Sequence, residues 1–202
     1  MPRPRSLNLP QIAAAALDVV DSDGLAALSM RTVARRLGIG TMSLYRYVAD
    51  RDELEAMVVD LVLDKVDLRV PEGSARQRVS VLAERVREAA AQHPAVVPLV
   101  LAHRHRTPAS MRWGEAMLGV LAEAGFAGTR RVYAFRALLA YIFGALEVEH
   151  YSALTGPGTR ALAELPAGEF PVLSETATVA RGITGADEFA QGLQIVLRGL
   201  EL

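Results

Sequence analysis

The sequence has 202 residues, of which 51% are hydrophobic, and its formal net charge is −1. This composition provides enough apolar side chains for a packed core and excludes a disordered chain. Because there is no cysteine, disulfides, thiol catalysis and cysteine-ligated zinc are also excluded.

The charge is unevenly distributed along the chain. Residues 1–51 carry seven arginines and four aspartates, net +3, whereas residues 52–202 are net −4. Because only residues 1–51 are net basic, we expect this N-terminal part alone to contact a polyanion. The N-terminus lacks the apolar run of a signal peptide, and the longest apolar segment, residues 132–146, is too short for a bilayer. We therefore expect a cytoplasmic protein with no membrane partner.

Apolar residues recur at helical spacing throughout, and no segment alternates as a strand does, so the chain is predicted to be all-α. Pro10 opens a first helix, which Gly24 ends. Ser29 and Asp50 are suited to cap the second and fourth helices. The predicted helices after the first cover about residues 30–37, 41–48, 51–70, 74–93, 94–104, 108–124, 128–154, 174–180 and 185–200.

Residues 155–173 are punctuated by proline and glycine and show no sustained period. We expect a long, mobile loop there. The organisation predicted for the whole chain is a three-helix domain over residues 1–53 and a larger helical domain over residues 54–202.

Residues 29–48 have the form helix, glycine turn, helix, which is the layout of a helix-turn-helix DNA-binding motif. Gly38 is predicted to end the first helix of the pair with a positive φ. At about 100° per residue, Leu44 and Val48 share a face of the second helix and can anchor it on the core.

The other faces of that second helix carry side chains suited to a duplex. Met42 and Arg46 point most directly away from the core face, and Tyr45 flanks them. Arginine suits a phosphate or a guanine, and tyrosine hydroxyls suit phosphates. The alternative interpretation is that Tyr45 and Tyr47 fill a small core while Arg46 is a solvated surface charge.

The run ALDVVDSDGLAALSMRTVARRLGIGTMSLYRYVADRDELEAMVVDLVL resembles the DNA-binding domain of the TetR-type bacterial repressors. The matching elements are Asp-Gly after the first helix, Leu-Ser-Met-Arg, Ala-x-x-Leu-Gly, Leu-Tyr-x-Tyr-Val and Arg-Asp-Glu-Leu. The C-terminal run EFAQGLQIVLRGLEL resembles the closing helix of the subgroup nearest the tetracycline repressor. The resemblance implies a homodimeric repressor that binds a palindromic operator in double-stranded DNA.

Family roles are transferred only to matching positions. The DNA-binding residues implied by the resemblance, together with Arg46 from the face analysis, are Ser29, Arg31, Thr41, Met42, Ser43, Tyr45, Arg46, Tyr47 and Arg51. Met30 and Met42 replace polar residues or proline found in some relatives, so base preference does not transfer. Arg3 and Arg5 either form a minor-groove arm or belong to an uninvolved tail.

The resemblance also implies that the larger domain binds a small-molecule effector, which releases the DNA. A cavity for such a ligand needs mostly apolar walls and a few polar groups. The candidate ligand-binding residues are His103, Trp113, Met117, Phe135, Tyr141, Glu147 and His150. The alternatives are that the apolar members are core residues and that Glu147 and His150 are a surface pair.

No cofactor, metal site or catalytic centre is expected. His103 and His105 are two positions apart and cannot face one metal on a regular helix. Gly38-Ile39-Gly40 is a fragment of a nucleotide-binding loop, but no strand precedes it, as such a loop requires. A nucleotide-binding enzyme is therefore not predicted. The alternative to a repressor is a helical small-molecule sensor or scaffold without specific DNA binding.

Overall fold

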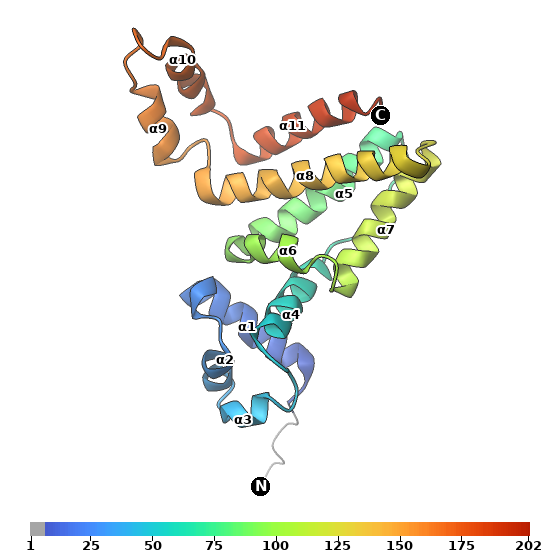
Figure 1. The fold of residues 1–202 in the computed structure, drawn as a ribbon, viewed down its shortest axis with the longest axis vertical. Helices are drawn as coiled ribbons and strands as arrows, with labels where there is room; N and C mark the ends of the chain where they lie inside the picture. The colour runs from blue at the N-terminus through green and yellow to red at the C-terminus, as the bar shows by residue number, and fades with distance from the viewer. Residues whose placement is uncertain (1–6) are drawn as a thin grey trace. The chain divides into compact units, whose positions relative to one another are not determined.

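The computed structural model describes residues 7–202, and within that range every regular element is helical, which confirms the predicted all-α class (Figure 1). Arg3 and Arg5 lie outside the described residues. The chain divides into two compact units, residues 1–69 with 88–116 and residues 70–87 with 117–202. Helices α5 (Ala75–Ala91) and α7 (Pro108–Glu123) contribute residues to both units. No helix of the described residues is long and apolar enough to cross a membrane.

The first unit begins with α1 (Leu9–Asp23). The Asn8 side chain accepts a hydrogen bond from the Gln11 N–H at 2.9 Å, and the Gln11 side chain accepts one from the Asn8 N–H at 3.1 Å. This capping box satisfies two N–H groups that a helix start leaves free, and Pro10 follows where its missing N–H costs nothing. The helix ends before Gly24, as predicted.

Helix α1 packs on α2 (Met30–Arg36) and on α4 (Arg51–Leu63), with α3 (Thr41–Leu44) seated against α2. The apolar residues that these helices share are fully buried, namely Ile12, Ala16, Val19, Val20, Leu28, Val33, Ala34, Leu44, Leu54 and Val58. The predicted three-helix core with α4 attached is therefore present. After α4, the first unit also contains the short turn Pro94–Val96 and α6 (Val97–His103), which packs on α4.

The turn between α2 and α3 depends on Gly38. Its φ is +69°, so the positive φ expected from the sequence is confirmed. The Ile39 N–H donates to the Ala34 carbonyl at 3.0 Å and the Gly38 N–H donates to the Arg35 carbonyl at 3.1 Å. These two bonds form a Schellman motif, which satisfies the last carbonyls of α2 and turns the chain into α3.

In the second unit, α8 (Gly128–Ser152) packs along α11 (Gly185–Gly199). Phe189, Leu193 and Leu197 of α11 are buried as one stripe. The Tyr141 hydroxyl of α8 donates to the Phe189 carbonyl at 2.7 Å, and a Cβ at Gly192 would collide with that hydroxyl. Gly192 therefore permits close packing of the two helices.

The loop predicted over residues 155–173 is wrong. That segment contains α9 (Pro157–Ala163), and α10 (Pro171–Ala180) begins within it. Gly156 caps α9 and Pro157 occupies its first turn, where proline favours a helix, so residues that suggest a break here start one. The two helices pack on each other, and the Ser174 hydroxyl donates to the Ala163 carbonyl at 3.1 Å.

Replacing Gly38 with alanine should lower the free energy of unfolding by about 1 kcal/mol, because an L-residue is strained at positive φ. A Cβ at this position meets no atom within 4 Å, so the cost comes from backbone conformation alone. For a chain of this size, the midpoint of thermal unfolding should fall by roughly 2–4 °C.

Gly119→Ala is the matched control, since Gly119 lies inside α7, has no positive φ and its added Cβ would meet no atom within 4 Å. Calorimetry should show no loss of stability for this variant. Equal losses in the two variants would contradict the role given to the Gly38 backbone.

Candidate DNA-binding surface

The second helix of the glycine-linked pair is shorter than predicted. Helix α3 covers only Thr41–Leu44, whereas the sequence predicts a helix that continues to Val48. The Tyr45 N–H donates to the Thr41 carbonyl at 3.2 Å, but the Tyr47 N–H returns to the Leu44 carbonyl, three residues back, at 2.9 Å. The chain thus tightens into a turn over residues 45–47, and the Tyr-Arg-Tyr run lies in that turn.

The inward and outward faces of this segment agree with the face analysis. Leu44 and Val48 are buried, whereas Met42 is 78% exposed and Tyr45 is 47% exposed. Arg46 is exposed as well. The alternative in which the tyrosines fill a core does not fit, because Tyr47, the less exposed of the two, is still 37% exposed.

Helix α2 adds a second set of groups to the same motif. The Ser29 hydroxyl accepts a hydrogen bond from the Thr32 N–H at 3.1 Å and so caps the helix. Arg31 and Arg35 are exposed and one helical turn apart, and no ion pair engages either of them within residues 7–202. Arg35 is not among the residues predicted from the sequence, although its spacing of four residues from Arg31 places both on one face of the helix.

Arg36, by contrast, is held by α1. It forms ion pairs with Asp18 and Asp23, the second at 3.0 Å, and its guanidinium also donates to the Ser22 hydroxyl at 3.1 Å. These partners occupy its donors, so Arg36 ties α2 to α1. Arg31, Arg35 and Arg46 remain as guanidinium groups of this motif that can meet a polyanion.

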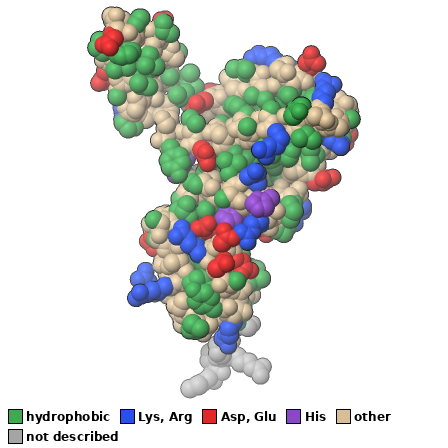
Figure 2. Space-filling view, viewed as in Figure 1, with side chains coloured by type: hydrophobic (Ala, Val, Ile, Leu, Met, Phe, Trp, Pro, Cys, Tyr) green, Lys and Arg blue, Asp and Glu red, His purple; other side chains and the backbone are tan. Residues whose placement is uncertain are grey.

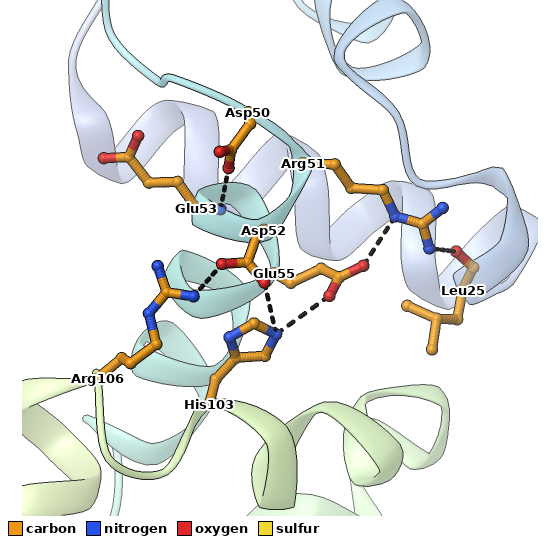
Figure 3. Close-up of polar contacts among 8 residues, drawn as sticks. All are labelled: Leu25, Asp50, Arg51, Asp52, Glu53, Glu55, His103 and Arg106. Atoms are coloured by element: carbon orange, nitrogen blue, oxygen red, sulfur yellow. Dashed lines mark hydrogen bonds and ion pairs between the residues drawn. The ribbon is translucent and has the colours of Figure 1, made fainter.

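Helix α4 begins with a second capped terminus. The Asp50 carboxylate accepts from the Glu53 N–H at 2.9 Å, which confirms the predicted cap. Arg51 follows, and its Nε donates to Glu55 at 2.7 Å while its terminal nitrogen donates to the Leu25 carbonyl at 3.4 Å (Figure 3). Arg51 is exposed at the position expected for a phosphate contact, with a carboxylate beside it.

His103 of α6 is buried and faces α4. Its Nε2 lies 3.1 Å from Glu55 and 3.9 Å from Asp52, and Arg106 pairs with the other side of Asp52 (Figure 3). The Arg106 hydrogen bond lowers the pKa of the Asp52 carboxyl below its ordinary value and raises that of the guanidinium. Asp52 and Glu55 are not among the site residues predicted from the sequence, because their contacts with His103 join positions about fifty residues apart.

The residues predicted to bind an effector are divided between the two units. His103 and Trp113 lie in the first unit and are buried; Met117, in the second, is also buried. In the second unit, Phe135, Tyr141 and Glu147 are partly exposed and His150 is exposed. Two hollows of the second unit, of about 410 and 360 Å³, are lined by other residues. The effector assignment stays a prediction.

Tyr141 has a structural partner. Its ring centroid lies 5.7 Å from that of Phe189, and its hydroxyl binds backbone carbonyls of α11. Burial raises the pKa of the Tyr141 phenol, and burial together with Glu149 raises the pKa of Glu188. The Tyr141 hydroxyl therefore joins α8 to α11, so an effector would have to compete for it.

A capped helix, a glycine turn and a short exposed second helix define a helix-turn-helix DNA-binding protein. Comparison with known families agrees. Residues 12–56 match the model described as "Bacterial regulatory proteins, tetR family", and residues 69–202 match "Tetracyclin repressor-like, C-terminal domain". The chain belongs to the TetR family of bacterial transcriptional regulators.

Similar proteins extend over almost the whole chain. The HTH-type transcriptional repressor DrrR1 of Streptomyces coeruleorubidus is 31% identical over 100% of this chain and 79% of its own length. The tetracycline repressor protein class D of Escherichia coli is 27% identical over 97% of this chain and 90% of its own. The structure of Streptomyces coelicolor ActR in complex with (S)-DNPA covers 98% of each chain, with 28% identity and a TM-score of 0.85.

Proposed function

We propose that this chain is a ligand-responsive transcriptional repressor of the cytoplasm. Residues 1–53 bind a palindromic operator in double-stranded DNA, and residues 54–202 bind a largely apolar small molecule and form a homodimer. Effector binding stabilises a conformer with lower operator affinity, and the difference in affinity between the two conformers drives release.

The observation that carries the DNA-binding part is the orientation of α3. Leu44 and Val48 are anchored in the core, so Met42, Tyr45 and Arg46 are exposed directly after the turn at Gly38. Met42 offers an apolar contact for a thymine methyl, and Arg46 offers donors for a phosphate or a guanine. We propose Ser29, Arg31, Thr41, Ser43, Tyr47 and Arg51 as the further contacts.

Replacing Tyr45 and Arg46 together with alanine should weaken specific operator binding at least tenfold, since each contact to a base or phosphate is worth about 1–3 kcal/mol. Fluorescence anisotropy over a salt series measures this, with DNA from upstream of the gene that encodes the chain. If Arg46 contacts a phosphate, the slope of log K against log salt should fall by about 1.

Arg160→Ala is the matched control, because Arg160 is an exposed arginine on α9 of the second unit. It removes the same charge and should leave operator affinity unchanged. Unchanged affinity in the double variant would instead favour the alternative, a small-molecule sensor or scaffold without specific DNA binding.

The dimer proposal rests on apolar side chains that α8 and α11 leave exposed. Val132 of α8 is exposed in the single chain. Tyr133, Val148 and Tyr151 of α8 and Ile195 of α11 are exposed as well. Large apolar side chains gathered on two packed helices are typical of a self-association surface. A twofold dimer built on them would be a four-helix interface.

Ile195→Arg should convert the dimer to a monomer, because Ile195 is 64% exposed in the single chain and a charge in the interface would be desolvated without a partner. Sedimentation equilibrium measures the mass. Met111→Arg, at a methionine on α7 that is 53% exposed, should leave the mass unchanged. A dimer that persists in Ile195→Arg would contradict this interface.

The effector part is supported by the relatives, whose structures include ActR in complex with (S)-DNPA and with actinorhodin. A compound at about 100 times its dissociation constant should stabilise the chain by about 2.7 kcal/mol. Thermal shift with actinorhodin, (S)-DNPA and tetracycline tests this class. A compound that raises the unfolding midpoint should also lower operator affinity in the anisotropy assay, and stabilisation without release would contradict the mechanism.

A further inference from the structure

We propose that Asp52, Glu55 and His103 form a binding site for a divalent transition-metal cation of the Zn²⁺ class. All three residues belong to the first compact unit, where α4 and α6 pack on each other. Figure 2 shows acidic, basic and histidine side chains gathered on one face there. The inference is independent of the proposed response to an effector.

The distances suit one small cation. One ligand atom from each residue lies within 4.8 Å of the other two. The His103 Nε2 is 3.1 Å from the Glu55 Oε2 and 3.9 Å from the Asp52 Oδ1. Ligand atoms about 2.0–2.1 Å from a tetrahedral zinc ion are roughly 3.3 Å apart, so a small side-chain adjustment would complete the geometry.

Each of the two carboxylates is paired with one arginine through one of its oxygens. Arg51 holds the Oε1 of Glu55, and Arg106 holds the Oδ2 of Asp52, which leaves the Oε2 and Oδ1 oxygens facing His103 (Figure 3). Ligating carboxylates are commonly oriented by hydrogen bonds to the oxygen that does not bind the metal. The two guanidinium groups therefore act as outer partners that aim the remaining oxygens at one point.

His103 is the buried member of the cluster. Its side chain is only 4% exposed, and its Nδ1 has no hydrogen-bond partner among the described residues. Its Nε2 is hydrogen-bonded to Glu55 at 3.1 Å, whereas Asp52 at 3.9 Å is too far for a hydrogen bond. A cation between Nε2 and the two oxygens would engage all three groups.

One imidazole and two carboxylates also indicate which cation to expect. Nitrogen and oxygen ligands together favour Zn²⁺, Co²⁺, Ni²⁺ or Mn²⁺ over Ca²⁺ and Mg²⁺, which prefer oxygen ligands alone. Three protein ligands leave at least one coordination position for water or another ligand. A bound ion would therefore keep an open position at this site.

Titration of the full-length protein with Co²⁺ tests the proposal through the visible d–d absorption of a bound ion. We expect one Co²⁺ per chain, displaced by stoichiometric Zn²⁺. Asp52→Asn and Glu55→Gln should each weaken binding by about tenfold or more. Asp52 is 53% exposed, so its replacement should leave the fold intact, which circular dichroism checks.

His105→Gln is the matched control, because His105 is exposed and lies two residues from His103 but outside the cluster. It should leave Co²⁺ affinity unchanged, and Zn²⁺ should raise the unfolding midpoint of this variant but not of Asp52→Asn. The proposal is overturned if no d–d absorption appears, or if Asp52→Asn and Glu55→Gln bind Co²⁺ as the unaltered protein does. It is also overturned if His105→Gln weakens binding as much as they do.

Discussion

The burial of Leu44 against the core of the first unit is the constraint on which the DNA-binding surface depends. Helix α3 has only four residues, too few to be stable alone, so it exists because this side chain is packed against its neighbours. With Leu44 buried, the helical geometry places the side chains of Met42 and Tyr45 at the surface. The exposure of the residues proposed to contact DNA is therefore a consequence of core packing.

Local hydrogen bonds fix the ends of the helices on either side of α3. Ser29 caps α2, the Schellman motif at Gly38 closes it, and Asp50 caps α4. Each device satisfies backbone groups that a helix end would otherwise leave free. Together they hold the segment between Arg36 and Arg51 in one conformation, so that its side chains meet a duplex without a large ordering cost.

The sequence could predict what depends on neighbours along the chain. Helical spacing, the positive φ of Gly38 and the caps at Ser29 and Asp50 are local properties, and the structure confirms them. The sequence could not predict α9, because proline and glycine can begin a helix as well as end one. Only the packing of α9 against α10 decides that these residues begin a helix here. Contacts across the fold, such as Glu55 with His103, leave no periodic signal.

Helix α4 shows how one carboxylate can serve two partners. Glu55 accepts from Arg51 through one oxygen and lies against His103 through the other, so it joins a surface guanidinium to a buried imidazole within one unit. Because one carboxylate makes both contacts, the orientation of Glu55 couples the position of Arg51 to that of His103.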